Sequence, residues 1–112
     1  FENANHNAGA PMPVPQELLA ANSEFYHHYL DPVWDAVRMN NITQHFATAY
    51  LGLHLRGDTD MAQYLDLVEN AADGVYAVDD EGAFMEDHTY WAGFPNRTAA
   101  GLRFERLGVG EN

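Results

Sequence analysis

The stretch that decides the fold is Asp31–Gly57, DPVWDAVRMNNITQHFATAYLGLHLRG. Asp31-Pro32 indicates a helix start, because aspartate accepts from free amides and proline at the first helical position sacrifices no hydrogen bond. Gly57 is a favourable C-terminal cap, so the sequence predicts a helix over 32–56, with a break at Asn40-Asn41 left open. Its apolar residues form one broad stripe that we expect to pack in a core: Val33, Trp34, Val37, Ile42, Phe46, Ala49, Tyr50 and Leu53.

Two further helices are predicted, one on each side of this stretch. Pro15 begins the first, over 16–30, where apolar residues recur at helical spacing. Asp58-Thr59-Asp60 caps another, whose apolar face holds Met61, Tyr64, Leu65 and Val68. Residues 1–14 are predicted to form a loop, since glycine and prolines interrupt regular structure there. Residues 15–69 therefore form the helical part of a single domain or fragment that spans 1–112.

Residues 70–112 are predicted to be irregular, because helical periodicity is lost from Asn70 onwards. Leu102 and Phe104 alternate with charged residues, which favours a short final strand within 98–107. The first residues, 1–5, are compatible with the end of another strand. We therefore expect a mainly α fold with one or two short strands at its ends.

The composition excludes several classes of function. The 112 residues include 5 basic and 17 acidic side chains, a formal charge of −12. This charge repels phosphate backbones and anionic membrane surfaces, so we expect no nucleic-acid and no membrane partner. The absence of cysteine excludes disulfides, thiolate metal sites and a cysteine nucleophile. Since the chain begins Phe1-Glu2-Asn3 without methionine, we expect it to be a piece of a longer protein or a processed product.

The six histidines follow no strong metal-binding pattern, and we expect no cofactor. His45 and His54 lie nine residues apart, so on one helix they point about half a turn away from each other. A composite metal site of His28, His54 and an acidic residue remains a weaker hypothesis. The acidic run 79–87 lacks the residue order of an EF-hand, and we predict a solvated loop there.

A complete catalytic set is absent from the sequence. Ser23 is the single serine, it lies in a predicted helix, and no Gly-x-Ser-x-Gly elbow surrounds it. His6 differs in context, because it follows a possible strand end and precedes the first helix in a glycine- and proline-containing loop. The triad histidine of an α/β hydrolase occupies such a loop, after the last strand of the sheet.

Several segments resemble the C-terminal part of predicted dienelactone hydrolases of the α/β-hydrolase superfamily: Asn5–Pro13, Asp31–Asp35, Arg38–Ile42, Leu51–Asp58, Tyr90–Phe94 and Gly101–Arg103. The resemblance implies a parent enzyme that hydrolyses a small-molecule ester or lactone, with His6 as the catalytic base. It also implies that the nucleophile, the acid and the oxyanion-hole donors lie upstream of Phe1. The chain would then be a C-terminal helical segment of an α/β-hydrolase-like protein, inactive alone.

An alternative function needs no chemistry. The predicted helices carry broad apolar stripes, and a surface of this kind has to be covered by self-association or by a partner. The alternative is therefore a non-catalytic helical module for self-association or binding, and on either hypothesis we expect a homo-oligomer.

Overall fold

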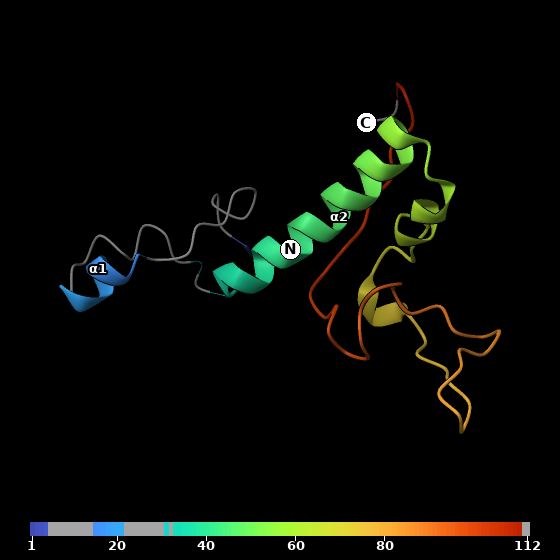
Figure 1. Cartoon of the computed structure of the whole chain (residues 1–112). Helices are drawn as coiled ribbons and strands as arrows, with labels where there is room; N and C mark the ends of the chain where they lie inside the picture. The colour runs from blue at the N-terminus through green and yellow to red at the C-terminus, as the bar shows by residue number, and fades with distance from the viewer. Residues whose placement is uncertain (5–14, 22–30, 32, 111–112) are drawn as a thin grey trace.

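The chain was analysed as a computed structural model that describes residues 1–4, 15–21, 31 and 33–110. Its regular elements are two α-helices, α1 (Gln16–Ala20) and α2 (Ala36–Arg56), and two 3₁₀ helices, η3 (Thr59–Tyr64) and η4 (Ala71–Asp73) (Figure 1). The described residues form no sheet; two isolated antiparallel bridges, Asn70 with Arg103 and Val78 with Phe84, are the extent of β pairing there. The mainly helical class predicted from the sequence is confirmed.

Helix α2 is continuous, and Asn40-Asn41 does not interrupt it. It begins at Ala36, four residues later than the predicted Pro32, because Asp35 is the N-cap and accepts from the Arg38 amide. Asp31 instead accepts from the amides of Val33 and Trp34 and thereby shapes the turn before the helix. Gly57 ends α2 in the left-handed conformation (φ 68°), as predicted.

Two other predicted helices are shorter than expected. Asp58 caps the next helix as predicted, but η3 is a 3₁₀ helix that stops at Tyr64 and does not reach Val68. A 3₁₀ helix has three residues per turn, so it cannot place all the apolar residues of 61–68 on one face. The helix ends at Tyr64, before the last of these residues. Within the described residues, α1 ends at Ala20, and Ala21 forms a turn; the rest of the predicted helix, 22–30, lies outside them.

The predicted terminal strands are wrong for the described residues. Residues 1–4 form a turn, in which the Glu2 amide donates to the Gly101 carbonyl. The segment 98–107 pairs only through Arg103, which forms one bridge. The alternation of Leu102 and Phe104 is real, but it directs both side chains onto α2, and no neighbouring strand lies along the segment to form a ladder.

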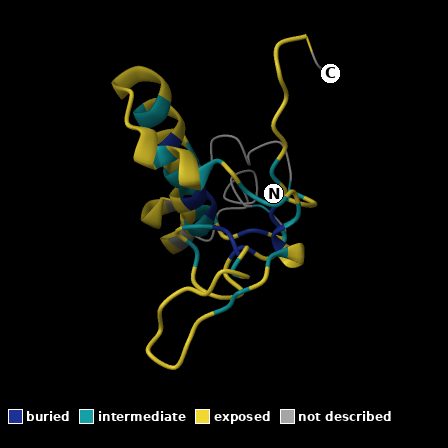
Figure 2. Ribbon diagram, turned by 90° about the vertical axis from the view of Figure 1, so that its right-hand side faces the viewer, coloured by how far each residue is buried: buried dark blue, intermediate teal, exposed yellow. Residues whose placement is uncertain are grey.

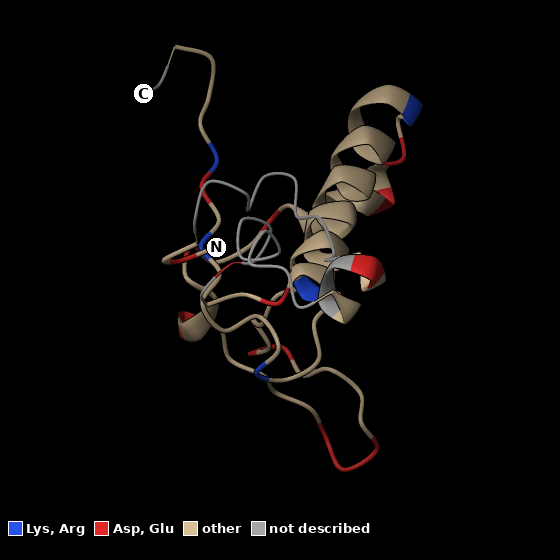
Figure 3. Ribbon diagram, turned by 90° about the vertical axis from the view of Figure 1, so that its left-hand side faces the viewer, with Lys and Arg blue, Asp and Glu red and all other residues tan. Residues whose placement is uncertain are grey.

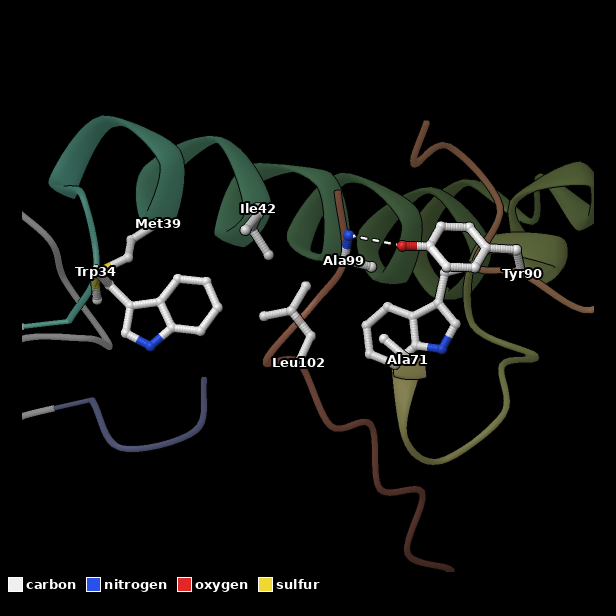
Figure 4. Close-up of a cluster of buried hydrophobic side chains, with 8 residues drawn as sticks. Trp34, Met39, Ile42, Ala71, Tyr90, Ala99 and Leu102 are labelled. Atoms are coloured by element: carbon white, nitrogen blue, oxygen red, sulfur yellow. Dashed lines mark hydrogen bonds between the residues drawn. The ribbon is translucent and has the colours of Figure 1, made fainter. Parts of the chain in front are cut away.

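The core lies between the inner face of α2 and the loops that follow η3 (Figure 4). Its buried residues are Trp34, Met39, Ile42, Ala71, Tyr90, Trp91, Ala99 and Leu102. Two polar groups of the aromatic residues are satisfied inside it: the Trp91 indole donates to the Val68 carbonyl, and the Tyr90 hydroxyl accepts from the Ala99 amide. These hydrogen bonds join parts of the irregular region after η3 to one another without a sheet.

Gly101 allows this segment to approach α2 closely. Its φ is +81°, and a Cβ atom there would lie 2.9 Å from Cζ2 of Trp34. A side chain would therefore be strained in its backbone and would collide with the indole ring. Phe1 covers another edge of the same ring, at 5.0 Å between ring centroids.

The predicted apolar stripe of α2 is only partly core. Its residues Ile42 and Ala49 are buried, whereas Val37 is 55% and Tyr50 is 56% exposed. Met39, which the predicted stripe did not include, is also buried. Val33, just before the helix, is 62% exposed. In Figure 2, α2 combines buried residues with exposed ones along its length. The predicted stripe therefore contains residues that the core buries and others that remain exposed to solvent.

Candidate functional site

His6, the predicted catalytic residue, lies outside the described residues, as do Ser23 and His28. The candidate triad base and the composite site of His28 with His54 are therefore not placed by the structure. Three histidines are described: His45, His54 and His88. Their surroundings decide whether this part of the chain holds a catalytic imidazole of its own.

Two hollows flank the segment 102–107 where it crosses the C-terminal half of α2. One has a volume of about 550 Å³ and the other of about 540 Å³. Phe46, Tyr50 and Phe104 line both of them, so the two hollows share an aromatic wall. Sequence periodicity could not predict them, because α2 and the C-terminal segment meet only after folding, with η3 at the first hollow and Phe1 and Trp91 at the second. The alternation of Leu102 and Phe104 is the one sequence signal that points to this wall.

The first hollow has a polar rim. His54, Asp66, Glu105 and Arg106 line it beside the aromatic wall. The exposed His54 ring lies 4.4 Å from the Tyr50 ring, one helical turn away. Neither described carboxylate on this rim is hydrogen-bonded to the imidazole, so His54 lacks the orienting partner that a general base requires.

His45 is held in an aromatic cage on the other side of α2. Its ring makes edge contacts with Phe46, Tyr64 and Phe94 at centroid distances of 5.0, 5.4 and 5.0 Å. Gly93 (φ +87°) approaches so closely that a Cβ atom there would lie 2.6 Å from Cε1 of the imidazole. Nε2 is buried and has no hydrogen-bond partner among the described residues.

This cage disfavours a charged imidazole. Burial lowers the pKa of His45, because desolvation penalises the protonated form. The titratable side chains that line the hollows beside His45 are Asp35, Arg38 and Tyr64. Arg38 lies 4.7 Å from the Trp34 ring and donates to the Thr98 carbonyl, so it belongs to the packing of the core.

His88 supports the loop 75–90. Its Nδ1 accepts from the Ala77 amide at 3.1 Å, and its ring stacks on Phe84 at 4.2 Å. No described carboxylate is hydrogen-bonded to any of the three described histidines. His45 is therefore packed among aromatic rings and His88 supports a turn, whereas His54 is exposed on the rim of the first hollow.

The charged groups of this region neutralise one another or face solvent. Arg103 donates to Glu69 and also pairs with Glu105, at 2.5 and 2.6 Å. The hydrogen bond that Arg103 donates to Glu69, followed by the negative charges of Glu105 and Glu69, raises the pKa of Arg103. In the exposed acidic run 79–87, Asp79 accepts from the amides of Glu81 and Ala83 and so forms a turn. Within the described ranges, no group of three or more histidines and carboxylates could hold a metal ion.

Several residues of the segments singled out in the sequence have structural roles where they are described. Trp34 packs on Gly101, Asp35 and Gly57 cap α2, and the Trp91 indole anchors the loop to Val68. Gly93 admits His45. These residues therefore contribute contacts and helix caps to the described part of the chain, and the segment that holds His6 is not among the described residues.

Comparison with known proteins found no family model, no curated protein and no solved structure that matches the chain. None of the helices in the described ranges has the length and apolarity that crossing a bilayer requires.

Proposed function

We propose that this chain is the C-terminal part of an ester or lactone hydrolase of the α/β-hydrolase type, with His6 as its catalytic base. The resemblance of Asn5–Pro13 and of five later segments to dienelactone hydrolases carries this proposal. The later segments contact one another through Trp34, Trp91 and Gly101 in the described structure. The glycine- and proline-containing loop with His6 precedes that unit in sequence.

His6 performs two proton transfers in the proposed reaction. Its imidazole takes the proton of the nucleophile as that group attacks the ester carbonyl, and it returns the proton to the departing alcohol. A water molecule then repeats the sequence on the acyl intermediate and releases the acid. The nucleophile, the carboxylate that orients His6 and the oxyanion-hole donors come from residues outside these 112, and the isolated chain hydrolyses nothing.

The test uses the longer protein and p-nitrophenyl esters of short acids. We expect His6→Ala to lower kcat by at least about 10³-fold, the effect of removing a triad member. His88→Asn is the matched control, because the asparagine Oδ1 can accept from the Ala77 amide as Nδ1 does. Undiminished hydrolysis by His6→Ala removes His6 from the mechanism, and hydrolysis by the isolated 112-residue chain contradicts the proposal as a whole.

A second candidate function is favoured by the exposed side of α2. Leu51 and Leu55 are 50% and 77% exposed, although both belong to the most regular element of the described chain. Leu51 and Leu55 lie one helical turn apart, so they form one small apolar patch on which another protein chain can pack. If this second function is correct, the chain is a non-catalytic self-association module. The longer protein then forms oligomers and hydrolyses no ester.

A further inference from the structure

One side of α2 presents a continuous uncharged strip. Its six residues are all exposed, and they are called the outer strip below: Val37, Asn41, Gln44, Thr48, Leu51 and Leu55. At about 100° per residue they lie within roughly 80° of one another around the helix axis. The buried residues Met39, Ile42 and Ala49 lie on the opposite side. The outer strip contains no buried residue, and along one edge Val37, Asn41, Gln44 and Thr48 line the hollows beside His45.

The outer strip is also the least acidic long surface of the described chain. None of the 17 acidic residues lies within the 21 residues of α2, which carries Arg38 and Arg56. Figure 3 shows the α2 ribbon with blue and without red, while red segments gather in the loops. Two copies with a formal charge of −12 each repel one another, and this repulsion is smallest where both present α2.

We propose that the outer strip pairs with the outer strip of a second copy of this chain, with the two helices antiparallel. Its residues are spaced alternately by four and three, which is the spacing of the positions that face a partner in a coiled coil. The leucines supply apolar contact near each end of the pair. The uncharged polar residues in the middle set the register at a cost in affinity. This inference rests on the second candidate function, self-association.

The antiparallel direction follows from the charges at the helix ends. Asp35 lies at the beginning of α2 and Arg56 in its last turn. Antiparallel packing brings each beginning near the other copy's end, so opposite charges and opposite ends of the helix dipoles become neighbours. In this register Val37 faces Leu55 of the other copy, and Gln44 faces Thr48 of the other copy.

The first experiment measures the mass of the 112-residue chain by light scattering and sedimentation over a range of concentrations. We expect a dimer that Leu51→Glu with Leu55→Glu weakens by more than about 100-fold. Val75→Glu with Val109→Glu is the matched control, because it also adds two negative charges at exposed apolar positions, outside α2. We expect this control to associate like the unchanged chain, and circular dichroism to show helix in all three proteins.

The second experiment tests the register. Val37→Arg and Leu55→Glu should each weaken self-association, and their mixture should form a mixed dimer, detected by native mass spectrometry. A monomeric unchanged chain overturns self-association and the outer strip together. If the Leu51→Glu, Leu55→Glu double variant dimerises as tightly as the unchanged chain, the chain self-associates through a surface other than the outer strip. Failure of the mixture to form the mixed dimer overturns the antiparallel register.

Discussion

The two sides of α2 differ in almost every property although they belong to one helix. The inner side buries Met39 and Ile42 among aromatic residues and is covered by loops from distant parts of the sequence. The outer side is exposed along its length and carries no charge on its outer strip. The buried side of this helix therefore specifies the fold through its core contacts. The exposed side contributes no buried residue, so it is available to bind a partner.

The largest effect should come from the core that covers the inner side. Trp91 is 1% exposed and anchored to the Val68 carbonyl, so Trp91→Ala should lower the free energy of unfolding by about 3–5 kcal/mol. Leu55→Ala, on the outer strip, should change it by less than about 0.5 kcal/mol at dilutions where the chain is monomeric. Urea unfolding followed by circular dichroism measures both, and equal losses would erase the distinction between the two sides.

A smaller effect is expected at the contact between Gly101 and Trp34. Gly101→Ala should cost about 1–3 kcal/mol, because the backbone is left-handed and the new Cβ meets the indole ring. Gly82→Ala separates the two causes, since Gly82 has φ +85° and nothing within 4 Å of the added atom. We expect the Gly82 variant to lose less stability in thermal unfolding, and an equal loss would show that the close approach is unimportant.

The aromatic cage should make the inner side sensitive to acid. The pKa of His45 in the folded chain lies below its ordinary value of 6.5, so the folded state binds fewer protons than the unfolded chain. This contribution to stability is complete above pH 6.5 and is lost as the pH falls towards the lowered pKa. We expect urea unfolding to become easier between pH values of about 7.5 and 5.5, above the range where carboxylates titrate.

His45→Phe is the variant that tests this cause. Phenylalanine fills the cage without a polar nitrogen, so the variant should be as stable as the unchanged chain at neutral pH, or more stable. Its unfolding should also depend less on pH than that of the unchanged chain over the same range. If both proteins lose stability in parallel, the acid sensitivity comes from groups other than His45.

The smallest effect should come from the exposed ion pairs of Arg103. Glu69→Gln removes one partner, but both side chains are more than half exposed and Glu105 remains beside the guanidinium. We expect a slight decrease in Tm at low salt and no difference from the unchanged chain at high salt, because salt screens exposed charges. A large decrease that persists at high salt would mean that this pair holds the C-terminal segment on α2.

Sequence patterns predicted the local features of α2 and little of what covers it. The cap at Gly57 and the helix start at Asp58 were predictable, because each depends on residues within a few positions. The N-cap at Asp35 was missed, since Asp31-Pro32 is an equally good start signal and only the fold selects between the two. The strand predicted in 98–107 was wrong, because alternation shows which side chains are apolar and not what they pack against.

The candidate site residues also include some that the sequence indicated and others that depend on tertiary contacts. His6 was singled out from its loop and from the family resemblance, and it remains a prediction. The cage of His45 could not be predicted, because Tyr64 and Phe94 lie 19 and 49 residues further along the chain. The first hollow beside Phe104 likewise depends on three separate segments, and the second depends on four.

By itself, the sequence determined that a long capped helix forms, that the chain is strongly acidic and that no cysteine chemistry is available. The capped helix depends on residues close together in the sequence. The net charge and the lack of cysteine follow from the composition alone. The tertiary structure decided which side of α2 is buried, where η3 ends and what surrounds His45. Such features depend on contacts between distant segments, and spacing along the chain does not encode which segments will meet.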